Sequence, residues 1–494
     1  MKFFDFFSKY KAQTPLWIAV IPLVVLVVVL ALVIKCFGAD AIMGGSQVAL
    51  LFAAAVAAVL AIFICGYKWQ VLEEAIVDNI RTSASAIIIL LLIGAISGTW
   101  MLSGTVPALI SYGLEIIHPK AFLGIACIIC ALVSLVTGSS WTTIATIGVA
   151  LMGIGQAMGF SEGWIAGAII SGAYFGDKVS ALSDTTVLAS SASNVPLFDH
   201  IRYMMITTVP SFVIAVLVFF GVSIAHTPDS AMQMEHIQSV LHNTFNITPW
   251  VLLVPAITAL LIVKKLPALI TLFTATVVAC VAMVVFQPDI VEKIGGADAM
   301  GAFKGLMTAI SSSTAIDTGD AMLNELVATR GMGGMLSTIW LILCAMCFGG
   351  VMAGSGMLAA LTRLFMRFAK RTVSIVASTI ATGLFCNLTT ADQYISIIIT
   401  GNTFGDLYTR RGLERRLLSR SVEDSATVTS VLIPWNSCGM TQSTVLGVAT
   451  MTYLPYCLFN LISPMLSIVV AAIGYKIVKT DKTDKTDKTD STNE

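Results

Sequence analysis

The sequence predicts an all-α polytopic membrane protein of about 12 transmembrane helices, in two inverted structural repeats with broken or re-entrant helices at mid-membrane. Three observations lead to this fold class: an apolar composition, long apolar runs and an internal repeat. Of the 494 residues, 57% are hydrophobic and 11% are charged. Soluble globular proteins carry about 25% charged residues. This chain therefore has too few charges to cover the surface of a water-soluble protein of its size.

Composition and motifs also exclude several functions. Lysine plus arginine and aspartate plus glutamate both number 28, so no basic excess points to nucleic acid. The C-x-x-C pairs at 127–130 and 344–347 lie in apolar runs and have no second pair at zinc-site spacing. A Walker-type phosphate loop, HExxH and GxSxG motifs and paired membrane histidines are absent from the sequence. We therefore expect a transporter that is not an enzyme and uses no cofactor.

Apolar runs locate the spans, because a transmembrane helix needs about 20 mostly apolar residues. The candidate spans are 16–37, 46–66, 84–110, 121–137, 202–224, 248–263, 267–287, 337–361, 372–388 and 445–474. Three further regions are apolar but rich in Gly, Ser, Thr and Asp, which predicts broken or re-entrant helices: 138–200, 389–407 and 421–442. Pro455 and Pro464 predict a kink in the last span.

Loop charges predict the orientation, because cytoplasmic loops carry an excess of Lys and Arg. The basic segments 363–371 and 410–420 are predicted to be cytoplasmic, and the less basic loops 225–247 and 288–336 to face outward. The end of the chain repeats Lys-Thr-Asp units, which predicts a disordered tail. The predicted organisation is N-terminal helices at 1–82, a first repeat at 83–224, connecting helices and loops at 225–336, a second repeat at 337–475 and the tail at 476–494.

The internal repeat consists of three pairs of similar segments that keep the same order. Gly98–Gly104 pairs with Gly350–Gly356, Thr137–Thr143 with Cys386–Asp392, and Ser183–Val187 with Glu423–Val428. The strongly basic loop 363–371 corresponds to the nearly neutral loop 115–120. Opposite charge character at equivalent loops predicts that the two copies are inverted in the membrane.

Acidic residues within the apolar regions are the candidates for chemistry, because an ionised group at the bilayer centre costs about 2.5–3.5 kcal/mol on insertion scales. Each lies among hydroxyls, amides or glycines, and hard cations prefer oxygen ligands. The predicted cation- or proton-binding residues are Asp177, Asp184, Thr185, Thr186, Asn387, Thr390, Asp392, Asp424, Ser425, Thr427 and Asn436, with Asp184 and Asp424 as ligands of transported sodium. The predicted re-entrant segment contains Gly138, Ser139, Ser140, Thr142 and Thr143.

Structural explanations stay open for several of these acids. Asp184 and Asp424 could be helix N-caps, because each is followed by Ser or Thr. Asp177 could pair with its neighbour Lys178, and Glu423 could be a surface ion-pair partner of the basic loop. Asp392 has no base nearby in the sequence and is the hardest to explain structurally. The histidines lie in loops or at span ends, so proton transfer is expected to use carboxylates.

Three motifs carry a resemblance to a known family. They are Gly138-Ser-Ser-Trp-Thr-Thr143, Gly176-Asp-Lys-Val-Ser-Ala-Leu-Ser-Asp-Thr-Thr186 and Glu423-Asp-Ser-Ala-Thr-Val-Thr-Ser-Val-Leu-Ile-Pro-Trp-Asn436. Together they resemble the NhaC-type sodium/proton antiporters over roughly residues 70–475. The resemblance implies an ion-transporter-superfamily fold with two inverted repeats. Because that family also includes malate/lactate exchangers coupled to protons and sodium, the resemblance leaves the substrate open.

The leading hypothesis is a secondary antiporter of the bacterial inner membrane that exchanges sodium, and lithium as a further cation, for protons. Its termini are expected in the cytoplasm and its partners are membrane lipid and a small cation, without nucleic acid; a homodimer is left open. The alternative is an organic-anion exchanger of the malate/lactate type coupled to the same ions. The sequence places no Arg in a span centre and only Lys178 nearby, which favours an inorganic cation. A channel fits less well, because an in-chain repeat with broken helices is typical of carriers.

Overall fold

The computed structural model describes residues 14–37, 44–225, 231–264, 266–320, 323–324 and 327–477. This part of the chain is helical apart from one isolated antiparallel bridge between Thr314 and Thr329. The predicted all-α class is therefore confirmed. The predicted tail lies outside the described residues from residue 478 on, as do residues 1–13 at the other end.

The first half of the chain contains two long helices, α4 and α11, and several short ones. Its elements are α2 (Leu16–Phe37), α3 (Gly45–Phe63), α4 (Trp69–Leu102), α5 (Thr105–Ile116), η2 (Pro119–Ala121), α6 (Phe122–Thr137), α7 (Ser140–Thr143), the π-helical turn η3 (Ile144–Gly148), α8 (Val149–Ala157), α9 (Glu162–Val179), α10 (Asp184–Ala192) and α11 (Leu197–Ala225).

The second half begins with connecting helices and ends with the second set of broken segments. Its elements are α12 (Ala231–Thr244), η4 (Pro249–Leu252), α13 (Leu253–Val263), α14 (Ala268–Phe286), α15 (Pro288–Gly295), α16 (Gly301–Ser311), η5 (Met332–Met335), α18 (Leu336–Gly354), α19 (Met357–Phe368), α20 (Thr372–Thr390), α21 (Gln393–Arg410), α22 (Arg415–Val422), the π-helical turn η6 (Glu423–Thr427), η7 (Ser430–Leu432), α23 (Ser437–Leu446), α24 (Thr450–Tyr453), η8 (Leu454–Tyr456) and α25 (Leu458–Ile473).

The described helices include eight that are long and apolar enough to cross a membrane, or ten when each of two bent pairs counts as one span. One bent pair joins the α24–η8 segment to α25 at an angle of 55°, which is the kink predicted for the last span. The helices α9 and α21 are 18 residues long but contain several polar residues. The span number of about 12 stays a prediction, because such polar helices are not recognised by length and hydropathy.

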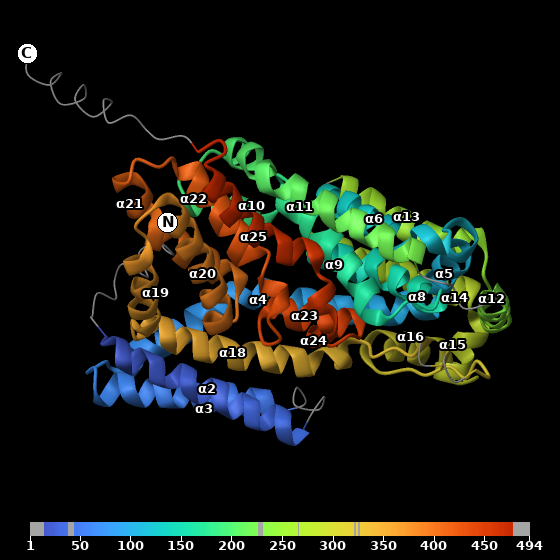
Figure 1. The fold of residues 1–494 in the computed structure, drawn as a ribbon. Helices are drawn as coiled ribbons and strands as arrows, with labels where there is room; N and C mark the ends of the chain where they lie inside the picture. Colours follow the sequence, from blue (N-terminus) through green and yellow to red (C-terminus); the bar gives the residue numbers. More distant parts are fainter. Residues whose placement is uncertain are drawn as a thin grey trace, which may run out of the picture.

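Long helices pack side by side through the middle of the molecule (Figure 1). One face of α18 lies against α4, and α18 also packs on α3, which pairs with α2. Figure 1 shows α19, α21 and α22 at one end and α12, α15 and α16 at the other. The basic loops and the less basic loops therefore lie at opposite ends of the molecule. That the basic end faces the cytoplasm stays a prediction.

Two predicted spans, 84–110 and 337–361, are each divided into two helices at a Ser-Gly pair. Gly104 separates α4 from α5 with a φ of 80°, and Gly356 separates α18 from α19 with a φ of 69°. Glycine adopts this left-handed conformation without the steric cost of a Cβ atom. The two junctions share sequence and backbone conformation, as the predicted repeat requires. The repeat as a whole, and its inversion, stay predictions.

Helix breaks occur in all three regions where the sequence predicted them. After α6, Gly138 has a φ of 66° and Ser139 caps α7. After α20, Ala391 has a φ of 57° and Asp392 caps α21. In the third region, α22 continues into the π-helical turn η6 and then into short segments. These breaks bring polar backbone and side chains into the interior of the helical bundle.

Candidate functional site

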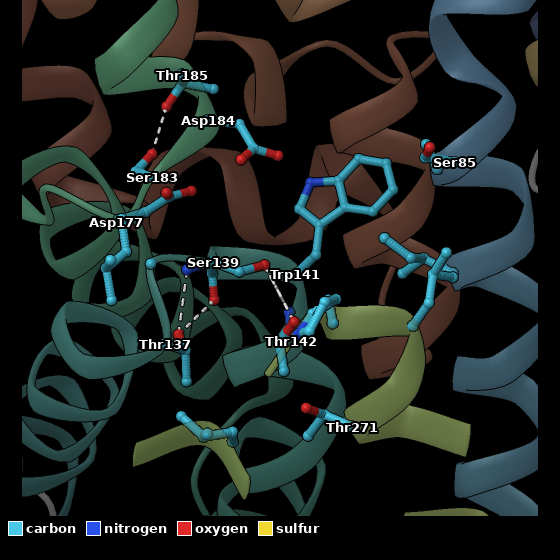
Figure 2. Close-up of a pocket in the computed structure, with 18 of the residues that line it drawn as sticks. Ser85, Thr137, Ser139, Trp141, Thr142, Asp177, Ser183, Asp184, Thr185 and Thr271 are labelled. Atoms are coloured by element: carbon cyan, nitrogen blue, oxygen red, sulfur yellow. Dashed lines mark hydrogen bonds between the residues drawn. The ribbon is translucent and has the colours of Figure 1, made fainter. Parts of the chain in front are cut away.

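A partly open cavity of about 590 Å³ lies beside the first helix break (Figure 2). Its lining includes the segment Thr137–Thr142 without Ser140, the end of α9, and the loop Leu182–Thr185. Side chains from α4, from the connection between α13 and α14, and from the start of α21 complete it. The cavity thus collects the first predicted broken region and parts of three other regions of the chain.

Asp177 is the buried carboxylate of the cavity wall. It lies in the last turn of α9, and its Oδ2 accepts hydrogen bonds from the backbone N–H of Ser140 at 3.1 Å and from the Ser140 hydroxyl at 2.6 Å. Close packing of α9 on α6 fixes this turn, because a Cβ atom at Gly172 or Gly176 would overlap the α6 backbone. The carboxylate is therefore held in place by the broken helix that follows α6.

Asp184 lies in the same cavity but is solvent-exposed. It is the first residue of α10, and the N-cap is Ser183, whose hydroxyl accepts from the Thr186 N–H. The capping explanation for Asp184 is therefore wrong. Figure 2 shows both carboxylates and the ring of Trp141 around one space. The indole N–H of Trp141 is buried, and the Cys438 thiol is a side-chain neighbour.

Asp392, by contrast, has a structural role that the sequence did not reveal. Its carboxylate caps α21 by accepting from the Ile395 N–H at 3.0 Å. It also accepts from the Ser83 hydroxyl at 3.4 Å. The residue seemed hardest to explain structurally because its partners are a backbone N–H group and a serine in another region. Neither of these two hydrogen-bond donors is a basic side chain.

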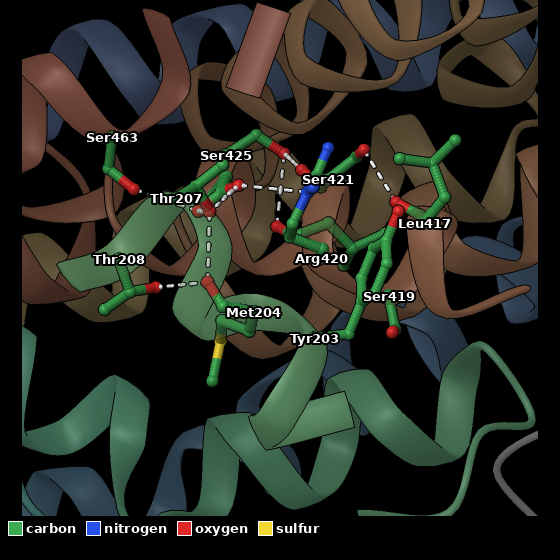
Figure 3. Close-up of polar contacts among 12 residues, drawn as sticks. Tyr203, Met204, Thr207, Thr208, Leu417, Ser419, Arg420, Ser421, Ser425 and Ser463 are labelled. Carbon is green, nitrogen blue, oxygen red and sulfur yellow. Dashed lines mark hydrogen bonds and ion pairs between the residues drawn. The ribbon is translucent and has the colours of Figure 1, made fainter. Parts of the chain in front are cut away.

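Asp424 occupies a second polar cluster, fully buried and outside the cavity lining. Lys178 donates to Oδ1 of Asp424 in a buried ion pair. The Thr207 hydroxyl lies 3.2 and 2.9 Å from the two carboxylate oxygens, and the Ser463 hydroxyl donates to Oδ1 at 2.9 Å. Figure 3 shows Thr207, Ser463 and Arg420 of this cluster. Arg420 Nε lies 4.0 Å from Oδ2. This cluster joins α9, α11, α22, η6 and α25.

Several interpretations of charged residues need correction. Asp177 does not pair with Lys178, because the two adjacent side chains contact different parts of the protein. Asp424 is not an N-cap, since it lies inside the π-helical turn η6. Glu423 is not on the surface; it is fully buried, with the Thr427 hydroxyl as a side-chain neighbour. Arg420, assigned to a cytoplasmic loop, is also fully buried.

His200 was predicted to lie at a span end and is buried there. Its Nδ1 lies 2.9 Å from the Ser419 hydroxyl.

Thr207 and Ser463 were missed as members of the Asp424 cluster. Each is a hydroxyl within three residues of a proline in an apolar helix, at Pro210 and Pro464. That pattern was the available signal, because proline frees backbone groups that local hydroxyls can bind.

The remaining predicted residues mostly brace the broken segments. Asn387 donates to the Ala426 carbonyl at 2.7 Å, and Asn436 donates to the Asn387 carbonyl at 3.2 Å. Ser425 and Thr186 also donate to backbone carbonyl groups. Apart from Asp424, the predicted site residues that do not line the cavity are Ser140, Thr143, Thr186, Asn387, Thr390, Asp392, Ser425, Thr427 and Asn436. Gly138, Ser139, Thr142, Asp177, Asp184 and Thr185 line the cavity.

A multi-helix protein with broken helices and carboxylates around one cavity has the features of a membrane carrier. A model of the Na+/H+ antiporter family matches residues 172–475. The Na(+)/H(+) antiporter NhaC of Bacillus subtilis is 35% identical over 407 residues, which cover 82% of this chain and 87% of that protein. The chain belongs to the Na+/H+ antiporter family, and it is therefore a transporter.

Relatives named for other exchange activities are similar to this chain to about the same degree. The malate-2H(+)/Na(+)-lactate antiporter of Bacillus subtilis is 35% identical over 406 residues, which cover 82% of this chain and 84% of that protein. The arginine/ornithine antiporter ArcD of Halobacterium salinarum is 34% identical over 470 residues, which cover 94% of this chain and 93% of that protein. All three are antiporters by name, and they differ in what they exchange.

Proposed function

We propose that this protein exchanges sodium for protons across the bacterial inner membrane and that sodium binds in the cavity at Asp177 and Asp184. The observation that carries the proposal is the convergence of two carboxylates and several hydroxyls on one cavity. Sodium is a hard cation, for which carboxylate, hydroxyl and water oxygens are suitable ligands. A volume of about 590 Å³ leaves room for the ion together with water.

The two carboxylates differ in how they would act. Asp177 is immobilised by Ser140 and offers a fixed negative charge in the wall. Asp184 is exposed within the cavity and can move with its bound ion. A carboxylate that binds either a proton or a sodium ion, but not both, exchanges one for the other. Sodium leaves and protons enter when the proton gradient drives the exchange.

Reconstitution into proteoliposomes tests this function directly. We expect sodium, and lithium as well, to dissipate an imposed pH gradient, whereas choline at the same concentration does not. Asp177→Asn should lose the sodium response. Asp298→Asn is the matched control, because Asp298 is an exposed residue paired with Lys304 away from the cavity. A pH gradient that persists in sodium and lithium with the wild-type protein would refute the proposal.

Organic-anion exchange is the second candidate, and buried Arg420 is the observation that favours it. The sequence argument against an organic anion relied on the absence of a buried arginine. The three guanidinium nitrogens of Arg420 have no hydrogen-bond acceptor among the described residues, and arginine binds carboxylates bidentately. Sodium remains the first candidate, because Arg420 does not line the cavity. A pH response to malate or lactate without sodium would favour this second function.

A further inference from the structure

The end of α9 places two adjacent residues of opposite charge in different surroundings. Asp177 forms part of the cavity wall, whereas the side chain of Lys178 reaches Asp424 in the other half of the chain. Lys178 is fully buried. Its backbone carbonyl accepts from the Thr186 hydroxyl at 3.0 Å, which ties this turn to the start of α10. Lys178 is therefore the direct link between the cavity segment and the Asp424 cluster.

The Lys178 ammonium group is surrounded by oxygen atoms of the kind that bind a small cation. Its hydrogen-bond acceptors are Oδ1 of Asp424 and the Ser463 hydroxyl, the latter at 3.0 Å. The Thr207 hydroxyl contacts both oxygens of the same carboxylate. One carboxylate and one hydroxyl thus contact the buried ammonium group directly, and the Thr207 hydroxyl from a third helical segment contacts the same carboxylate. Hard cations prefer such oxygen ligands.

We infer that the Lys178 ammonium is a tethered cation occupying an oxygen site at Asp424, Thr207 and Ser463 that takes a sodium ion when Lys178 leaves it. The inference rests on the proposed function, because it takes sodium as the transported ion. A buried carboxylate without a counter-charge is strongly unfavourable, so Asp424 needs one cation or the other. Lys178 therefore competes with sodium and lowers the apparent sodium affinity of the protein.

Arg420 provides the rival explanation. Its Nε lies 4.0 Å from Oδ2 of Asp424, and its guanidinium group lies over the ring of Tyr203 at 5.0 Å. If Arg420 is sufficient as the counter-charge, then Asp424 needs neither Lys178 nor sodium. Removal of the lysine charge distinguishes the two explanations, because only a vacant cation site would respond to sodium.

The test is the thermal unfolding of purified Lys178→Gln protein in detergent, in sodium chloride and in choline chloride of equal ionic strength. We expect this variant to be less stable than wild type in choline and to recover stability in sodium. The sodium concentration that gives half-maximal stabilisation should be at least about tenfold lower for the variant than for wild type. In wild type, the Lys178 ammonium is out of the site in only a small fraction of molecules.

Two controls make the result specific. Lys304→Gln removes the charge of an exposed lysine that pairs with Asp298 at 2.7 Å, and its sodium response should equal that of wild type. The double variant Lys178→Gln/Asp424→Asn has neither charge, and its stability should no longer recover in sodium. Recovery that is equal in sodium and choline, or no recovery at all in Lys178→Gln, would overturn the inference in favour of Arg420.

Protein yield gives a further decisive outcome. Purification of Lys178→Gln in sodium but not in choline is an expected result. If it is obtained in neither salt while the double variant is obtained, the pair only stabilises the fold and the inference is wrong. The inference and the proposed function can fail separately: sodium can stabilise Lys178→Gln without wild-type sodium/proton exchange, and exchange can occur without a sodium effect on Lys178→Gln.

Discussion

The cavity at Asp177 and the cluster at Asp424 contain the same kind of side chain in two different surroundings. Asp177 is buried in a cavity wall and is held by the hydroxyl and N–H groups of Ser140. Asp424 does not line this cavity and is paired with Lys178. The first carboxylate can receive its counter-charge from solution, whereas the second receives it from the protein. Burial alone therefore does not identify the ion-binding acid of a carrier.

The largest predicted effect is on stability at Asp424. In Asp424→Ala, the positive charge of Lys178 is left buried without its partner. Breaking a buried ion pair in this way costs about 3–5 kcal/mol, and we expect a loss of that size in the free energy of unfolding. Unfolding in detergent measures it. A loss below about 1 kcal/mol, the range of an exposed ion pair, would show that Arg420 and Lys178 do not need this carboxylate.

A smaller effect on stability and a large one on transport are expected at Asp177. Asp177→Asn keeps the shape of the side chain but removes its charge, so the bond from the Ser140 hydroxyl should weaken by about 1 kcal/mol. Sodium/proton exchange should fall at least about tenfold, because the fixed charge of the cavity is lost. Proteoliposome transport and thermal unfolding of the same preparation measure both. If exchange is unchanged, Asp177 is not part of the sodium site, and the proposed difference between Asp177 and Asp424 is wrong.

The contribution of the Ser140 hydroxyl can be separated from that of the carboxylate. Ser140→Ala removes the 2.6 Å hydrogen bond to Asp177 but keeps the backbone N–H bond. Hydrogen bonds to charged groups contribute about 1.5–3 kcal/mol, and we expect a loss of stability near the lower value. Exchange should decrease only a few-fold, since the charge remains. Ser374→Ala, which removes a capping hydroxyl at the start of α20 that does not line the cavity, is the matched control.

The smallest effect on stability is expected at Asp184. This residue is exposed, and Ser183 is the cap of α10, so Asp184→Asn should change stability by less than about 0.5 kcal/mol. The concentration of sodium required for half-maximal exchange should increase, because one of the two cavity charges is lost. A sodium titration in proteoliposomes measures this concentration. If it is unchanged, the cavity site contains only Asp177.

Local sequence located the helix breaks in the regions rich in hydroxyls and glycines, as at Gly138, which adopts a left-handed conformation that favours glycine. It did not locate the junctions at Gly104 and Gly356, which divide two spans predicted to be continuous. Asp392 shows the limit of such reasoning. Its acceptance of the Ile395 N–H is a local capping pattern, but its contact with Ser83 joins residues that are 309 positions apart in the chain.

The sequence by itself determined that this is an all-helical membrane protein of an antiporter family, because composition, apolar run length and motif order do not depend on packing. Only the tertiary structure decided which acid faces the cavity and which is neutralised. Lys178 and Asp424 are separated by 246 residues, and neither their pairing nor the burial of Arg420 and Glu423 follows from neighbouring residues. The physical reason is that solvent access and counter-charges are set by helices that meet in space, whereas hydropathy and capping act over a few residues of the chain.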